Sequence, residues 1–112
     1  MTTARITEPI SVENYLDGEL VSPVKHEYVA GAVFAMVGAR NAHNVIASNT
    51  HGLLYTALRG RPCRPCNSDT KIRIRASDHV RFYYPDVSVV CQANPLSDTF
   101  QDRPVLIVEV LS

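Results

Sequence analysis

Residues 105–111 read VLIVEVL, and this stretch decides the fold. Only Glu109 interrupts its apolar run, which occupies both of the faces that alternate along a strand. Such a run is typical of a central strand that helices cover on each side. A second apolar strand is expected over residues 82–91 (FYYPDVSVVC), with Pro85 near its start or at a bulge, because proline cannot donate to a strand ladder.

Each of these strands carries one carboxylate. The period of two places Glu109 on a face with apolar neighbours, so we expect it in the low-dielectric interior, where an unpaired ion is costly. Asp86 shares a strand face with Ser88 in the same way. Two carboxylates on neighbouring strands repel each other unless a cation lies between them, and Mg²⁺ is the usual cation for carboxylates beside substrate phosphates. The alternative is a pair of loop-facing or salt-bridged acids.

The upstream residues predict two helices and a hairpin. Ser11 is the expected N-cap of a short helix that ends near residues 17–18. Residues 27–36 predict a hairpin that turns at Ala30-Gly31. A longer helix is expected from Asn41 to about Gly60, with one apolar face packed on a sheet. This order of elements predicts an α+β fold, with a mixed central β-sheet and flanking helices, in a single domain over residues 1–112.

A basic strand is expected before the first of the two acids. Residues 69–75 (DTKIRIR) alternate strictly, so Lys71, Arg73 and Arg75 share one face, which we expect to be solvent-exposed. The formal net charge of the chain is zero, but residues 59–81 hold seven basic side chains and two acidic ones. A basic surface beside an acidic pocket suits a phosphate backbone. The alternative is a solvated strand face that binds nothing.

Composition places the chain among soluble proteins of the cytoplasm. It has 46% hydrophobic residues and no uncharged apolar run long enough to span a membrane or to resemble a secretory signal. Three cysteines without such a signal favour free thiols in a reducing compartment. Cys63 and Cys66 have the spacing of a zinc knuckle, but a second closely spaced ligand pair is missing. His43 is either a catalytic base or a capping or solvated group at the start of a helix.

The order of several short motifs resembles one known family. Tyr84-Pro85-Asp86 before an apolar strand, followed by residues 108–112 (VEVLS), is similar to the Uma-two family of restriction-endonuclease-like proteins, of the PD-(D/E)XK class. Similar family positions run along almost the whole chain, at residues 11–16 (SVENYL), His26-Glu27-Tyr28, His43-Asn44 and Ser68-Asp69.

The resemblance implies a restriction-endonuclease-like core with a metal-dependent site. In it, Glu27, Asp86 and Glu109 would hold one or two Mg²⁺ (or Mn²⁺) ions and catalyse the hydrolysis of a DNA phosphodiester. The basic stripe Lys71, Arg73 and Arg75 would then position DNA through its phosphates.

The chain departs from the family pattern after its last strand. The family places a lysine just beyond the Glu-x-Leu segment, and no residue here matches it. The helix expected after that strand is missing as well. We therefore expect a domain truncated at its C-terminal end, with weak or no cleavage by this chain, and a homo-oligomer that covers the incomplete sheet face. The alternative function is a non-catalytic nucleic-acid-binding or oligomerisation domain on the same fold.

Overall fold

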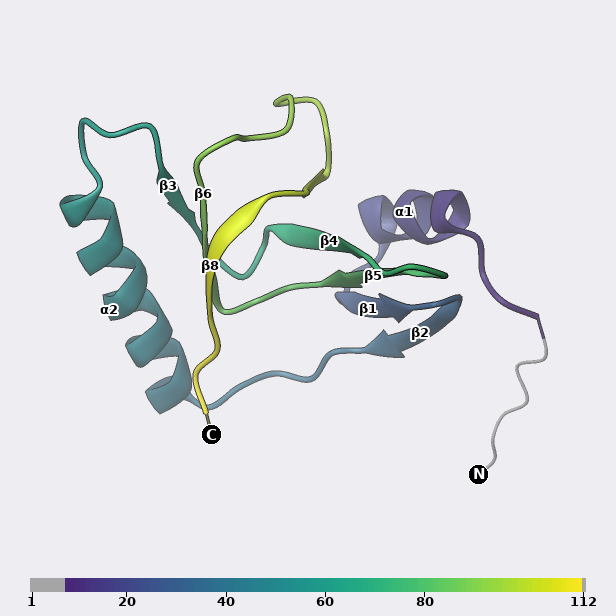
Figure 1. The fold of residues 1–112 in the computed structure, drawn as a ribbon. Helices are drawn as coiled ribbons and strands as arrows, with labels where there is room; N and C mark the ends of the chain where they lie inside the picture. Colours follow the sequence, from purple (N-terminus) through teal and green to yellow (C-terminus); the bar gives the residue numbers. More distant parts are fainter. Residues whose placement is uncertain (1–7, 112) are drawn as a thin grey trace. The chain divides into compact units, whose positions relative to one another are not determined.

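The computed structural model describes residues 8–111, which contain two helices and eight strands (Figure 1). In chain order these are α1 (Val12–Val21), β1 (His26–Val29), β2 (Ala32–Ala35), α2 (Asn41–Ala57), β3 (Arg64–Cys66), β4 (Lys71–Arg75), β5 (Val80–Tyr83), β6 (Val87–Val90), β7 (Phe100–Gln101) and β8 (Pro104–Val108). One sheet has the order β2-β1-β5-β4-β7 and the other the order β3-β6-β8. The larger sheet is mixed, because β4 and β7 run parallel while β1 is antiparallel to both of its neighbours. The predicted α+β class with a mixed sheet is confirmed and is consistent with a restriction-endonuclease-like fold.

The chain forms two compact units. The first comprises residues up to 36 together with residues 74–83, and the second comprises residues 37–73 together with the chain from residue 84 onward. Strand β4 carries the chain from the second unit into the first. That the chain forms a single domain stays a prediction. Over residues 8–111, neither helix combines the length and the apolar character that a membrane crossing requires.

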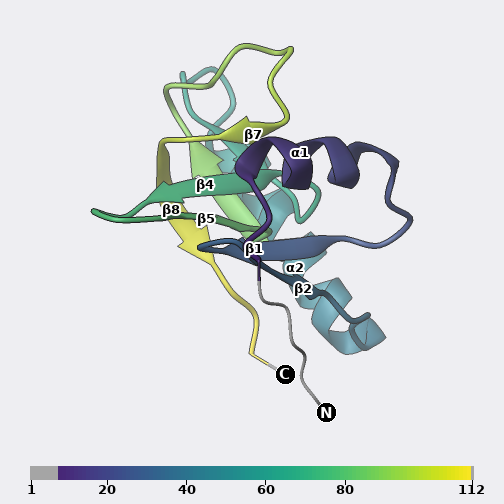
Figure 2. The same ribbon diagram turned by 90° about the vertical axis from the view of Figure 1, so that its right-hand side faces the viewer.

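Figure 2 shows α1 lying along one side of β1 in the first unit. An aromatic cluster anchors the helix there. Ser11 caps the helix as predicted, since its hydroxyl accepts a hydrogen bond from the backbone N–H of Asn14 at 3.1 Å. Tyr15 is buried, and its ring centroid lies 4.9 Å from that of Tyr28 and 5.3 Å from that of Phe82. The helix runs to Val21 and not to residues 17–18, because a glycine inside a helix weakens it without ending it.

The predicted hairpin is confirmed. Strands β1 and β2 pair antiparallel in a register that sets Val29 opposite Ala32. The two turn residues, Ala30 and Gly31, have φ of 50° and 94°. Two successive positive φ values are what a two-residue turn needs to match the right-handed twist of the flanking strands.

In the second unit, β6 is the central and most buried strand. It pairs antiparallel with β3 on one side and β8 on the other, all four of its residues are buried, and α2 contacts both β3 and β6. The expectation of one strand over residues 82–91 is wrong: β5 and β6 are separate strands in different sheets, broken at Tyr84-Pro85-Asp86. The break follows from Pro85, which has no N–H to continue the ladder.

Strand β8 is an edge strand, which corrects the prediction that it is central and covered on both faces. Among residues 8–111 it pairs only with β6, and Val105, Leu106 and Ile107 are 65%, 45% and 41% exposed. The longer helix also covers less than predicted, since no residue of α2 is fully buried. An apolar strand sequence shows which side chains are suited to burial. The order of strands in the sheet decides how many neighbouring strands are there to bury them.

Candidate active site

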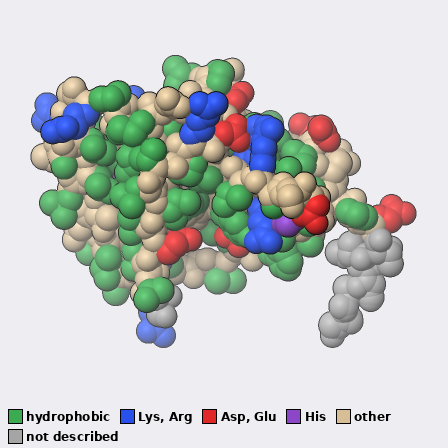
Figure 3. All heavy atoms as spheres, viewed as in Figure 1, with side chains coloured by type: hydrophobic (Ala, Val, Ile, Leu, Met, Phe, Trp, Pro, Cys, Tyr) green, Lys and Arg blue, Asp and Glu red, His purple; other side chains and the backbone are tan. Residues whose placement is uncertain are grey.

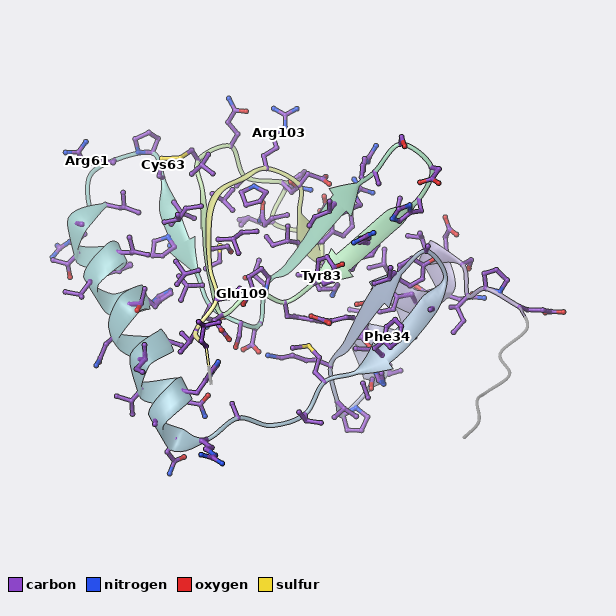
Figure 4. The ribbon with its side chains drawn as sticks, turned by 60° about the horizontal axis from the view of Figure 1, so that its bottom comes forward. Phe34, Arg61, Cys63, Tyr83, Arg103 and Glu109 are labelled. Atoms are coloured by element: carbon purple, nitrogen blue, oxygen red, sulfur yellow. A yellow bond between two sulfur atoms is a disulfide. The ribbon has the colours of Figure 1, made fainter. Side chains whose placement is uncertain are left out.

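The register between β6 and β8 brings Asp86 and Glu109 together. Val87 lies opposite Val108 at the end of this antiparallel pair. Asp86 is the residue just before β6 and Glu109 the residue just after β8, so continuing the register by one step sets them opposite each other. Figure 4 shows Glu109 beyond the end of β8, on the side of the unit where α2 lies.

Reciprocal hydrogen bonds join the two segments at this point. The backbone N–H of Asp86 donates to Oε1 of Glu109 at 3.1 Å, and the backbone N–H of Val110 donates to Oδ2 of Asp86 at 2.7 Å. Each carboxylate is thus tied to the other segment through one of its two oxygens. Hydrogen bonds to a carboxylate from fixed backbone groups restrict its rotamer.

His43, in the first turn of α2, completes the cluster. Its Nε2 lies 3.2 Å from Oδ2 of Asp86, and the two side chains are only 14% and 18% exposed. Of the two readings offered by the sequence, the solvated or capping group is therefore wrong, because the side chain faces Asp86 and α2 has no side-chain cap at Arg40. Sequence could have found this residue only through the family position His43-Asn44, since nothing local to α2 distinguishes a histidine that faces a strand end.

A polar cavity opens beside Asp86. Its volume is about 310 Å³, and apart from one alanine its lining side chains are polar: His43, Asn44, Ala47, Ser48, His51, Asn67, Ser68 and Asp86. All of these residues belong to the second unit. Amides, hydroxyls and imidazoles in this arrangement are suited to hydrogen-bonding the oxygens of a phosphodiester.

Two carboxylate oxygens remain for a cation. Among residues 8–111, no hydrogen bond or ion pair uses Oδ1 of Asp86 or Oε2 of Glu109. No arginine or lysine in this range neutralises either acid. Hard oxygen ligands of this kind fit Mg²⁺, which keeps several waters and uses one or two carboxylates. The described part of the chain nevertheless holds no group of three or more His, Cys, Asp or Glu side chains that could bind a metal ion.

Glu109 is exposed, which corrects the expectation that it is carried into the interior. Strand β8 ends at Val108, so the alternation that would bury Glu109 has already stopped at this residue. Its carboxylate is held by the N–H of Asp86 and is accessible to water. A cation at this point would therefore exchange with solvent and would not need to compensate a buried charge.

Glu27, the third predicted acid, lies on β1 in the first unit, opposite Phe34 of the hairpin. Its participation in a shared site stays a prediction. Asp86 and Glu109 are the two members of the predicted set that the second unit brings into contact.

The predicted basic stripe is not a solvated face. Lys71 is 7% exposed, and its Nζ lies 5.4 Å from the centroid of the Tyr84 ring. Arg73 donates two hydrogen bonds to the carboxylate of Asp102, at 2.7 and 2.8 Å, and its guanidinium lies 4.3 Å from the Phe100 ring centroid. The hydrogen-bonded carboxylate raises the pKa of Arg73 above its ordinary value.

Arg75 alone of the stripe is exposed. Exposure along β4 does not alternate as predicted, since Lys71 is buried and Ile74 is exposed. Tertiary contacts use the charges of Lys71 and Arg73. DNA contact by this stripe stays a prediction.

Two of the three cysteines form a disulfide, which corrects the expectation of free thiols. Cys63 and Cys91 are joined across the start of β3 and the end of β6, and Cys66 is free. The register of β3 on β6 sets Arg64 opposite Val90, so Cys63 and Cys91 come next to each other one step further out. The disulfide removes two of the three thiols from any zinc knuckle.

Comparisons with known proteins agree with the motif order. A family model described as "Putative restriction endonuclease" (Uma2) matches residues 12–112. An uncharacterized protein of Synechocystis sp. is 39% identical over 104 residues, which cover 92% of this chain and 54% of the relative. A second uncharacterized protein of the same organism is 30% identical over 115 aligned residues, covering 100% of this chain and 64% of the relative.

The chain thus spans about half to two thirds of the length of these relatives. No solved structure matches it. The resemblance drawn from Tyr84-Pro85-Asp86 and residues 108–112 is confirmed. The chain belongs to the Uma2 family, whose description is "Putative restriction endonuclease".

Proposed function

We propose that the chain carries the metal-binding part of a Mg²⁺- or Mn²⁺-dependent DNA endonuclease, with Asp86 and Glu109 as metal ligands. The observation that supports this most is the β6–β8 register, which sets two carboxylates opposite each other at the ends of paired strands. Family membership points to the same class of function. A role for Glu27, the third acid that the family resemblance implies, stays a prediction.

The chain's own residues would orient the site. Oδ2 of Asp86 accepts from Val110 N–H and lies beside His43 Nε2, so the carboxylate is restrained while Oδ1 stays available. His43 is therefore a positioning residue in this proposal. The polar lining of the adjoining cavity would bind the oxygens of the scissile phosphate. A divalent ion, when bound, supplies Lewis acidity toward a phosphodiester and a more acidic bound water.

Calorimetric titration of the chain with Mn²⁺, without DNA, tests the ligands. We expect that Asp86→Asn and Glu109→Gln each abolish the binding isotherm, because each removes one anionic oxygen donor. We expect His43→Gln to weaken binding by about 10- to 100-fold, the usual effect of losing a group that orients a ligand.

Asp98→Asn is the matched control. Asp98 is an exposed acid of the same unit, and its Oδ2 accepts from Asn94 Nδ2, an interaction that an asparagine oxygen retains. This variant should bind Mn²⁺ like the parent. Parent-like Mn²⁺ binding by Glu109→Gln, or cleavage of supercoiled DNA by that variant at the parent's rate, would remove the basis of the proposal.

A non-catalytic nucleic-acid-binding or oligomerisation domain is the second candidate. The absence of a three-ligand metal group over residues 8–111 favours it. The exposed apolar residues of β8 suit a homo-oligomer in which a second copy covers this edge strand. Salt-sensitive DNA binding without any Mn²⁺ binding by the parent would favour this candidate over the endonuclease.

A further inference from the structure

The basic side chains within residues 59–81 differ in their surroundings. Lys71 and Arg73, which the sequence marks for DNA, are buried or ion-paired. Three other arginines of the segment lie earlier, where the chain leaves α2 and enters β3: Arg59, Arg61 and Arg64. All three are exposed. Figure 3 shows Lys and Arg side chains gathered over this part of the second unit, and Figure 4 labels Arg61 there.

These arginines line one cavity. It has a volume of about 260 Å³ and is bounded by Tyr55, Leu58, Gly60, Cys63 and Pro65 in addition to the three arginines. Every lining residue belongs to the second unit. A concave surface lined by three arginines offers several N–H donors to the oxygens of an anion, and a planar guanidinium matches phosphate geometry.

The three charges have no acidic partner in the part of the chain that the structure describes. None of them forms an ion pair or side-chain hydrogen bond within residues 8–111, in contrast to Arg73 with Asp102. The C-terminal carbonyls of α2 stabilise cations at this end of the helix, and their partial negative charge of about one half is small beside three guanidiniums. The cavity therefore attracts anions.

The backbone that presents the arginines is held at both ends. Gly60 adopts φ of +78°, and Arg61 N–H donates to the Leu58 carbonyl at 3.0 Å, so the turn after α2 is closed. At the other end, Cys63 is joined to Cys91. A surface fixed before binding loses less conformational entropy on binding than a flexible loop does.

The length of α2 relates this cavity to the candidate active site. The helix has 17 residues, so its two ends lie about 25 Å apart at 1.5 Å per residue. His43 is in the first turn, and the arginine cavity begins just past the last one. This distance corresponds to about seven base pairs of duplex at 3.4 Å each. One duplex could therefore contact both ends of α2.

We propose that Arg59, Arg61 and Arg64 form a phosphate-binding site for the backbone of double-stranded DNA, about seven base pairs from the scissile phosphate. The inference rests on the proposed function for its choice of ligand. In this proposal the arginine site, and not the stripe Lys71, Arg73 and Arg75, makes the main non-specific contact with DNA. The site contacts phosphates and does not read bases.

The test is the salt dependence of DNA binding, measured by fluorescence anisotropy with a duplex of about 20 base pairs, well beyond the seven that separate the two sites. EDTA is present, so that metal binding does not contribute. Each phosphate contact adds about 0.9 to the slope of log K against log salt, so replacing all three arginines with glutamine should reduce the slope by about 2.7. Arg103→Gln is the matched control, since Arg103 is exposed in the same unit and, within the described residues, donates only to Gln92.

Replacing the three arginines with lysine should restore the slope, because a lysine ammonium neutralises a phosphate as a point charge. A loss of less than about 1.8, equivalent to two contacts, would overturn the inference. So would a parent that does not bind duplex, or an equal loss in Arg103→Gln. Calorimetry with inorganic phosphate alone separates the two sources of phosphate, and tight binding of the free anion would also count against a DNA site.

The failures of the two proposals are distinguishable. Mn²⁺ binding that requires Asp86 and Glu109, together with an unchanged DNA slope in the glutamine variant, would leave the endonuclease standing and remove the arginine site. A reduced DNA slope in the glutamine variant, without any Mn²⁺ binding by the parent, would support the arginine site and remove the endonuclease proposal.

Discussion

Opening the Cys63–Cys91 disulfide should cost a substantial part of the stability of the chain. The two residues are 28 apart in sequence, and the bond restricts the unfolded ensemble by closing that loop. For a loop of this length the chain-entropy relation gives about 3.6 kcal/mol at 25 °C. Because small domains have unfolding free energies of about 5–15 kcal/mol, the loss would be easily measured.

Urea unfolding of the Cys63→Ser/Cys91→Ser double variant, compared with the parent, measures this loss. The midpoint should fall, and the denaturant dependence should rise, because an unfolded chain without the crosslink exposes more surface. Cys66→Ser is the control, since this cysteine is free and its replacement leaves the loop closed. The parent with added dithiothreitol should behave like the double variant.

A loss below about 1 kcal/mol would refute the entropic argument, which assigns roughly 3 kcal/mol or more to loops of this size. The bond itself has an independent check. Titration of thiols in the denatured, unreduced protein should find one thiol per chain, that of Cys66. Three thiols would show that the sequence-based expectation of a reduced protein was right.

Two further substitutions test the packing of each unit. Ser88 is fully buried on β6, and its Oγ has no hydrogen-bond partner in the described range. Ser88→Ala should therefore stabilise the folded protein by about 1 kcal/mol, measured by thermal unfolding. Destabilisation would mean that the hydroxyl has a partner. Gly31→Ala should destabilise by roughly 2 kcal/mol, because φ is +94° and an added Cβ would lie 2.4 Å from the Cβ of Pro9. The matched Gly18→Ala, with nothing within 4 Å of the new Cβ, should stabilise α1 by about 0.5–1 kcal/mol, and equal effects of the two changes would contradict this account of the turn.

Features that depend on neighbouring residues could be predicted from the sequence. Ser11 caps α1 because its side chain reaches an N–H three residues on, and the turn at Ala30-Gly31 needs only two permissive residues between strands. Asp86 and Glu109 were identified because each is a single carboxylate at an apolar strand.

Other features depended on which strands became neighbours. The edge position of β8, the exposure of Glu109 and the approach of His43 to Asp86 all follow from the pairing of β8 with β6 alone and from α2 against β6. The pairing of Arg73 with Asp102, 29 residues away, could not be inferred from the alternation of β4. Alternation assigns a side chain to a face and does not say what lies against that face.

The sequence by itself determined the family, the α+β class, the hairpin turn and the two acids of the candidate site, since each depends on residue types at short spacings. Tertiary structure decided which charges were paired, which cysteines formed the disulfide, and which arginines had no ion pair among the described residues. These properties depend on contacts between residues far apart in the chain. Strand register decides which residues meet, and burial sets the free energy of each contact; short sequence patterns specify neither.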